Sequence, residues 1–184
     1  FELAGKTLGL VGFGAIGQLV ARRLAGFDVR TLAYDPLVPD SQIRAEGAEP
    51  ASLEDLVRQS DIVSIHARLL PETEGLIGRR ELALMKPTAY LVNTARAGLV
   101  DESALVEALR QRRIAGAALD VFWREPLPAD DPLLGLDNVT LTTHLAGTTL
   151  DALHNSIDLV IWGVLEYMQR DDTAWVVNPG ALAS

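Results

Sequence analysis

Three glycines near the start of the chain restrict its fold more than any other feature. The apolar run 8–11 (LGLV) leads directly into residues 12–17 (GFGAIG). In such a strand-to-helix turn, Gly12 permits the tight bend, Gly14 lets a pyrophosphate approach the backbone, and Gly17 lets helix and strand pack closely. The N–H groups at the start of the helix then point at the phosphates. The spacing predicts a dinucleotide-binding βαβ unit, and a glycine-rich turn without a ligand is the alternative.

An acidic residue ends the next apolar run. Asp35 stands in Leu32-Ala33-Tyr34-Asp35-Pro36. A carboxylate at that place accepts hydrogen bonds from both ribose hydroxyls of the adenosine half, and it repels a 2′-phosphate. The sequence therefore favours NAD over NADP as cofactor. The alternative interpretation is a turn-forming aspartate before a proline.

Short apolar runs alternate with amphipathic segments along residues 1–150, which is typical of an α/β fold with a doubly wound parallel sheet (Rossmann). The 184 residues, 48% of them hydrophobic, are enough to bury one core, so a single domain is expected. The predicted strands are residues 7–11, 29–34, 62–65, 89–93, 117–121 and 139–142.

The intervening helices follow from apolar spacing and capping residues. Ile16, Val20 and Leu24 recur every four residues and predict one buried stripe. Asp101 is a predicted N-cap. Residues 123–137 contain three prolines and four acidic residues, so they are predicted to form a loop.

The composition excludes several classes of function. A formal net charge of −9 repels phosphate backbones, so the sequence argues against nucleic-acid binding. The chain has no cysteine, which excludes disulfides, cysteine zinc sites and thiol catalysis, and no metal site is predicted. No run approaches the roughly 18 apolar residues of a membrane span. These features are compatible with a cytoplasmic protein.

Three polar residues follow successive later strands, at the sheet edge where open α/β proteins bind ligands. Arg96 follows the strand 89–93, Glu125 follows the strand 117–121, and His144 follows the strand 139–142. The reduction of a 2-oxo acid needs a cation for the carboxylate and the carbonyl oxygen, which suits the planar guanidinium of arginine. It also needs a proton donor that titrates near neutrality, which suits histidine, and a carboxylate beside the histidine fixes its tautomer. Alone, each residue could equally be a surface arginine, a loop glutamate or a histidine at a strand end.

These motifs together resemble the D-isomer-specific 2-hydroxyacid dehydrogenase family. The resemblance covers nearly the whole chain, and its most specific blocks are residues 93–101, 116–126 and 142–147. It implies that Arg96 binds the substrate, that His144 is the acid/base and that Glu125 is its partner. It also implies contacts between the NAD cofactor and a further set of residues. These are Gly12, Gly14, Ala15, Ile16, Gly17, Asp35, His66, Thr94, Ala95, Arg96, Asp120, His144 and Gly147.

The sequence departs from the family in three respects. Ala97 replaces a common glycine, and Arg68 lies where the loop after His66 more commonly contains proline. Arg68 either adds a phosphate contact or is merely solvated. Family members also have a substrate-binding domain, which is expected to be largely missing here. Residues 1–150 then form the NAD-binding domain, and residues 151–184 form a crossing helix and tail of the substrate domain. Such a chain is expected to bind the cofactor but turn over poorly.

The resemblance leaves other functions open. An NAD-sensing regulatory protein of the corepressor type keeps the same three residues. A formate dehydrogenase tends to carry glutamine where Glu125 stands, and other NAD enzymes of the same fold lack the set of three. The expected substrate is a small 2-hydroxy or 2-oxo acid, with a phosphoglycerate-dehydrogenase-like activity favoured. The resemblance further implies a homodimer.

Overall fold

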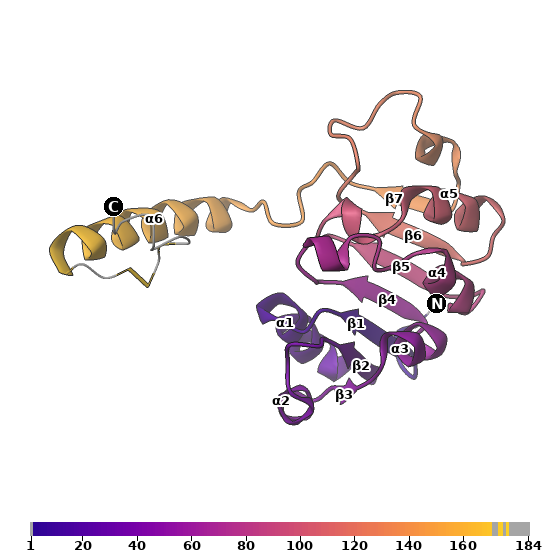
Figure 1. Ribbon diagram of the computed structural model, residues 1–184, viewed down its shortest axis with the longest axis horizontal. Coiled ribbons are helices and arrows are strands. Elements are labelled where there is room, and N and C mark those ends of the chain that lie inside the picture. The colour runs from indigo at the N-terminus through magenta and orange to yellow at the C-terminus, as the bar shows by residue number, and fades with distance from the viewer. Residues whose placement is uncertain (1, 171–172, 175, 177–184) are drawn as a thin grey trace. The chain divides into compact units, whose positions relative to one another are not determined.

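The computed structural model describes residues 2–170, 173–174 and 176, in two compact units, Phe1–His144 and Leu145–Ser184. The first unit is built on a parallel sheet of seven strands in the order β3-β2-β1-β4-β5-β6-β7, which runs from the lower to the upper edge in Figure 1. The order reverses between β1 and β4, as in a doubly wound fold. The strands are β1 (Thr7–Val11), β2 (Arg30–Tyr34), β3 (Glu49–Pro50), β4 (Ile62–Ile65), β5 (Tyr90–Asn93), β6 (Gly116–Leu119) and β7 (Val139–Leu141).

Helices pack against both faces of this sheet and form two apolar clusters. In one cluster, the buried side chains of Leu56, Leu82 and Leu105 lie among apolar residues of the strands. In the other, Ala21 and Ile43 pack with the side chains of β1 and β2. The helices that supply these residues are α1 (Ala15–Leu24), α2 (Asp40–Ala45), α3 (Leu53–Gln59), α4 (Arg79–Leu84) and α5 (Glu102–Arg110).

The six predicted strands are confirmed, each within two residues of its expected ends. The strand β3 was not predicted, because its two residues, Glu49 and Pro50, have no apolar pattern. The predicted buried stripe of α1 is wrong at Ile16, which is 64% exposed, while Gly17 and Ala21 are the buried residues of this helix. Because α1 begins at the edge of the sheet, its first turn faces the space above the strand ends rather than the core.

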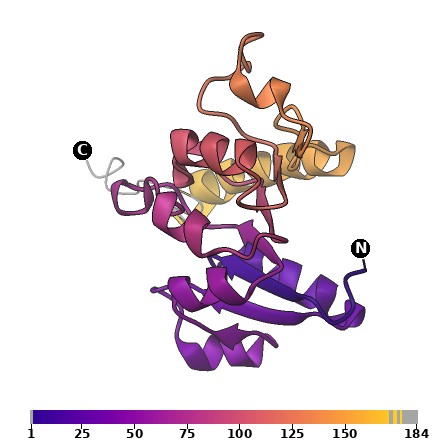
Figure 2. The same ribbon diagram turned by 90° about the vertical axis from the view of Figure 1, so that its right-hand side faces the viewer.

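The segment between β6 and β7 is the predicted loop 123–137, and it projects from the sheet in both views (Figures 1 and 2). It contains one short 3-10 helix, Pro132–Gly135, that the proline content did not predict. The Asp131 carboxylate accepts a hydrogen bond from the Leu133 N–H, and the Leu133 side chain is buried. This turn anchors an otherwise irregular segment to the core.

The second unit contains the predicted long helix, α6 (Leu150–Arg170). The Thr149 hydroxyl accepts a hydrogen bond from the Ala152 N–H at its first turn. None of the α6 residues is buried, and its apolar side chains, such as those of Leu153, Ile157 and Val164, are exposed. Most of the predicted tail, residues 171–172, 175 and 177–184, lies outside the described residues. No helix in the described part of the chain is long and apolar enough to cross a membrane.

Candidate active site and cofactor loop

The loop between β1 and α1 has the geometry that its three glycines predict. Gly12 has a φ of +94°, and a Cβ there would lie 2.4 Å from the Ala67 amide nitrogen. A Cβ on Gly17 would lie 2.4 Å from the Gly12 carbonyl oxygen, so only glycine permits this packing of helix and strand. The Cβ position of Gly14 is open, and this N-cap residue of α1 makes no side-chain hydrogen bond to the first turn. The loop therefore fits the pyrophosphate of a dinucleotide, held by the N–H groups of α1.

Asp35 connects the end of β2 to this loop. Its carboxylate oxygens accept hydrogen bonds from the N–H groups of Phe13, at 2.8 Å, and Leu37, at 2.9 Å. Each oxygen retains a further lone pair, so the half-buried carboxylate can still accept the ribose hydroxyls. The position fits the predicted role in ribose binding. It also adds a positioning role that the sequence did not indicate, because Asp35 holds the glycine loop against β2.

Glu125 and His144 form the hydrogen-bonded pair that the sequence predicts. The Glu125 carboxylate lies 2.9 Å from His144 Nδ1 through one oxygen and accepts the Phe122 N–H at 3.0 Å through the other. Because a carboxylate only accepts hydrogen bonds, Nδ1 carries the hydrogen, and Nε2 is the atom left for a reacting group. His144 has a φ of 59°, a left-handed conformation that is costly for a residue with a Cβ. Such strain is common at functional sites.

The charges around Glu125 keep it ionised. The hydrogen bond with His144 lowers the pKa of Glu125 most, followed by the hydrogen bond from Phe122. Partial desolvation raises this pKa, while the positive charges of His144 and Arg96 lower it further. The net direction is down, so Glu125 is a carboxylate at neutral pH. The contribution from Arg96 brings the third predicted catalytic residue into the same electrostatic environment.

Arg96 is positioned by a buried asparagine at the end of β5. The Asn93 side chain donates to the Arg96 carbonyl at 2.9 Å and accepts the Ala95 N–H at 3.0 Å. Among the residues that the structure describes, the Arg96 guanidinium donates only to the Ala95 carbonyl, at 2.6 Å, and it is exposed. Its remaining donors are therefore open to an incoming carboxylate. The sequence did not single out Asn93, although an asparagine directly after a buried strand is a recognisable signal for such a turn.

Two further predicted residues lie at strand ends close to this site. Asp120, after β6, is buried and accepts a hydrogen bond from the Thr142 hydroxyl at 2.6 Å. His66, after β4, has Nε2 at 2.9 Å from the Ser64 hydroxyl oxygen, and burial lowers its pKa. The sequence did not predict Thr142 and Ser64 as the hydrogen-bond partners of Asp120 and His66. The predicted contact of Gly147 stays a prediction, because Gly147 belongs to the second unit.

Seven of the predicted site residues line two separate cavities, namely Ile16, His66, Thr94, Ala95 and Arg96 in one and Glu125 and His144 in the other. One, of about 350 Å³, is lined by Ile16 of the glycine loop and by residues 66–69 and 94–96, which include Thr94 and Ala95. The other, of about 400 Å³, is mostly apolar and contains the Glu125–His144 pair. The first suits a polar or charged group and the second an apolar one.

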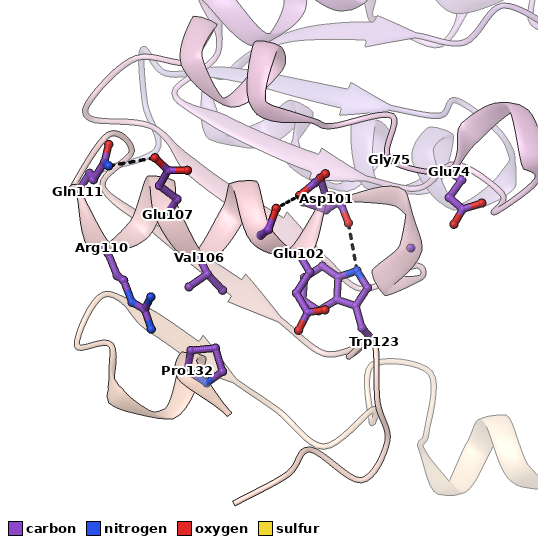
Figure 3. Close-up of a pocket in the computed structure, with 13 residues that line it drawn as sticks. Glu74, Gly75, Asp101, Glu102, Val106, Glu107, Arg110, Gln111, Trp123 and Pro132 are labelled. Carbon is purple, nitrogen blue, oxygen red and sulfur yellow. Dashed lines mark hydrogen bonds between the residues drawn. The ribbon is translucent and has the colours of Figure 1, made fainter. Parts of the chain in front are cut away.

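A larger cleft of about 900 Å³ lies along α5 (Figure 3). Its lining includes the carboxylates of Glu74, Asp101, Glu102 and Glu107, and the indole of Trp123, whose N–H donates to the Val100 carbonyl at 3.1 Å. This acidic lining repels phosphates, so the cleft does not suit a dinucleotide. Among the described residues, no group of three or more histidine, cysteine or acidic side chains has the arrangement of a metal site.

Comparison with known proteins gives consistent matches. The NAD-binding domain of the D-isomer specific 2-hydroxyacid dehydrogenases matches residues 1–146. The chain is 45% identical over 182 residues to the glyoxylate reductase of Thermofilum pendens, which covers 98% of this chain and 54% of that protein. It is 46% identical over 178 residues to the D-3-phosphoglycerate dehydrogenase of Methanocaldococcus jannaschii, covering 96% of this chain and 34% of that protein.

A solved structure agrees with these sequence matches. The NAD complex of a D-isomer specific 2-hydroxyacid dehydrogenase from Lactobacillus delbrueckii ssp. bulgaricus superposes with a TM-score of 0.84 at 31% identity. The superposition covers 92% of this chain and 55% of that chain.

The chain therefore belongs to the D-isomer specific 2-hydroxyacid dehydrogenase family and contains its NAD-binding domain. The predicted family, the doubly wound sheet and NAD as the cofactor of this domain are confirmed. The chain spans about half the length of the glyoxylate reductases it matches, 54% for that of Thermofilum pendens.

Proposed function

We propose that this chain supplies the cofactor-binding and catalytic residues of an oxidoreductase that interconverts a D-2-hydroxy acid and its 2-oxo acid. The observation that carries the proposal is the hydrogen bond between Glu125 and His144 Nδ1, which leaves Nε2 free to exchange a proton. Arg96 adds a guanidinium with open donors in the same electrostatic environment. A cation, a proton donor and a dinucleotide loop are the parts that this reaction needs.

In the direction of reduction, Arg96 binds the substrate carboxylate through its planar fork and polarises the carbonyl group. NAD(H) supplies or accepts the hydride when it is bound. His144 donates the proton from Nε2 to the carbonyl oxygen as that oxygen becomes a hydroxyl. Glu125 holds the imidazole ring and stabilises its positive charge before the transfer. In oxidation, His144 accepts the proton instead.

The other predicted contacts define the cofactor's place. The loop of Gly12, Gly14 and Gly17 would hold the pyrophosphate, and Asp35 would hold the adenosine ribose. Asp120 would accept a hydrogen bond from the nicotinamide carboxamide. The accepting atom would be either Oδ1, which also accepts the Thr142 hydroxyl, or Oδ2. The remaining candidates, Ala15, Ile16, Thr94 and Ala95, would line the site between them.

We propose a phosphoglycerate-dehydrogenase-like substrate and treat glyoxylate as the competing one. The similarity to the D-3-phosphoglycerate dehydrogenase of Methanocaldococcus jannaschii, at 46%, supports the first. The similarity to the glyoxylate reductase of Thermofilum pendens, at 45%, supports the second almost equally. Turnover is therefore to be measured with 3-phosphohydroxypyruvate, hydroxypyruvate and glyoxylate at equal concentrations, following NADH absorbance.

The same assay tests the proposed reaction. The 184-residue chain is expected to turn over more slowly than a longer protein that contains it, because Arg96, Glu125 and His144 are all exposed to solvent here. A slow but His144-dependent oxidation of NADH supports the proposal. The absence of turnover in a longer protein that binds NADH tightly would overturn it in favour of an NAD-sensing regulatory role.

We further propose that α6 packs against another part of a longer protein, as the crossing helix of a substrate domain. Its exposed apolar residues, including Leu153, Ile157 and Val164, support this, since an apolar surface of this extent is rarely left in water. The family resemblance also supports a homodimer and a cytoplasmic location. Sedimentation equilibrium of this chain and of a longer protein tests the dimer, and a monomer in both would contradict it.

A further inference from the structure

Arg68 is an exposed cation that the mechanism does not use. It follows β4 and lines the cavity of about 350 Å³ together with Ile16 and Arg96. Most arginines of the chain form ion pairs, such as Arg22 with Glu46 and Arg30 with Glu49. Within the described residues, by contrast, the Arg68 guanidinium makes no hydrogen bond and no ion pair, and only its backbone carbonyl is engaged.

The backbone of Arg68 is fixed by its neighbours. The Thr73 hydroxyl donates to the Arg68 carbonyl at 2.7 Å and accepts the Leu70 N–H at 2.8 Å. The Gly75 N–H donates to the Gly98 carbonyl at 2.8 Å, which ties this segment to the turn after Arg96. Arg68 is therefore held on a supported turn, so less conformational entropy is lost when its side chain binds a ligand.

The segment that carries Arg68 lies directly against the glycine loop. The His66 N–H donates to the Val11 carbonyl at 2.7 Å, and the Ala67 backbone occupies the space beside Gly12 that a Cβ would fill. Arg68 is the next residue along the chain. Its side chain therefore starts beside the turn that places the phosphates, on the β4 side of the point where the strand order reverses.

The charge of this cavity differs from that of the chain. The protein has a net charge of −9, yet none of the described residues that line this cavity is acidic, and two of them are arginines. Two guanidinium groups in one small cavity repel each other unless an anion lies with them. Ile16 belongs to the first turn of α1, whose N–H groups favour the same kind of ligand.

We infer that Arg68 binds the pyrophosphate of the dinucleotide beside the glycine loop, and so contributes to the affinity of this chain for NAD(H). The inference rests on the proposed cofactor site. Arg96, on the β5 side of the cavity, remains available for the substrate carboxylate. A second anionic group on the substrate is the competing ligand for Arg68, and the experiment separates the two.

The test measures binding, by NADH fluorescence and by displacement of NADH with ADP or with adenosine. Arg68→Ala is expected to weaken the binding of NADH and ADP about tenfold, the loss of one charge-assisted hydrogen bond at an exposed site. Adenosine, which has no phosphate, should bind within about twofold of the wild type. Arg68→Lys should recover part of the ADP affinity. Arg23→Ala removes an exposed arginine at the far end of α1 and serves as the matched control, with no change expected.

The outcomes distinguish this inference from the proposed function. Unchanged ADP and NADH affinities in Arg68→Ala, with a wild type that binds both, would overturn the inference alone. The inference alone would also be overturned if the affinities for ADP and adenosine fell equally in Arg68→Ala, or if only the affinity for 3-phosphohydroxypyruvate fell. A wild type that is folded but binds neither NADH nor ADP would overturn the cofactor site itself.

Discussion

The cofactor side of the sheet and its catalytic side are built in different ways. Around β1 and β2, the glycine loop is packed against neighbouring backbone, and Asp35 is tied to it by a hydrogen bond of 2.8 Å. At the ends of β5, β6 and β7, the functional side chains of Arg96, Glu125 and His144 are exposed, and only the residues beneath them are buried. The first region is therefore packed against its own backbone neighbours, whereas the second presents exposed side chains.

Because of this difference, we expect substitutions in the two regions to affect different properties, stability in one and turnover in the other. Substitutions on the cofactor side disturb packed backbone, so they are expected to affect folding and binding together. Substitutions of the exposed catalytic side chains are expected to affect turnover while leaving the fold intact.

The largest effect is expected for His144→Ala. Loss of the proton donor should lower kcat about 10²- to 10⁴-fold in a protein that turns over. The free energy of unfolding should change by less than about 0.5 kcal/mol, because the side chain is exposed. Steady-state kinetics and denaturant unfolding measure the two quantities. Arg124→Ala, at an exposed neighbour of Glu125, is the control, and a His144→Ala variant with near-normal kcat would contradict the assignment.

Gly12→Ala, in contrast to His144→Ala, should impair both the stability of the fold and the binding of NADH. A methyl group there meets the backbone of His66 and Ala67 at 2.4 to 2.7 Å, and the φ of +94° is strained for alanine. The variant should lose on the order of 3 kcal/mol of stability and bind no NADH. Gly14→Ala is the matched control, since its Cβ position is open. Gly14→Ala should fold normally and still bind NADH weakly. Equal destabilisation of both variants would contradict the expected difference between the packed position 12 and the open position 14.

Asn93→Ala tests whether the buried Asn93 side chain holds the turn that carries Arg96. Removing the side chain leaves the Ala95 N–H and the Arg96 carbonyl without their partner. A loss of about 1–3 kcal/mol in unfolding free energy is expected. Because the turn then holds Arg96 less firmly, KM for the 2-oxo acid should rise more than kcat falls. An unchanged KM in a destabilised variant would show that Asn93 supports the fold only.

The smallest effects concern titration. Burial lowers the pKa of His66, so its ring should stay neutral below the ordinary value of 6.5. Since the folded state then binds fewer protons, stability should fall as the pH drops from 6.5 through the folded pKa. The pKa of Glu125 is lowered chiefly by His144, so its carboxylate should persist at pH 4.5 and be lost only below it. NMR titration of the His66 ring and of the Glu125 carboxylate measures both pKa values, with His66→Gln to assign the ring signal. A His66 ring that titrates at or above pH 6.5 would contradict the prediction for His66.

Most of the fold could be predicted because its signals are local. The glycine loop, the strand runs and the cap of α5 by Asp101 each depend on residues close in sequence, and the Asp101 carboxylate does accept the Ala104 N–H at 2.8 Å. The exposure of Ile16 could not be read from its spacing, because apolar periodicity does not reveal that the first turn of a helix faces a cavity.

The candidate site was predictable in its main residues but not in their support. Arg96, Glu125 and His144 stand in recognisable blocks at strand ends. Asn93 acts through local hydrogen bonds to Ala95 and Arg96, so its signal was present in the sequence. Thr142 acts through a contact that arises only when the strands align, the hydrogen bond to Asp120 across neighbouring strands. Long-range contacts of this kind leave no periodic signal in the sequence.

We propose above all that the glycine loop and Asp35 form one site for NAD in this chain. The most direct test is a parallel fluorescence titration of the purified chain with NADH and with NADPH. We expect saturable binding of NADH and at least tenfold weaker binding of NADPH, because Asp35 repels the 2′-phosphate, and Asp35→Ala should narrow that ratio. Equal affinities for the two cofactors, or an unchanged affinity ratio in Asp35→Ala, would contradict the proposed role of Asp35 in ribose binding.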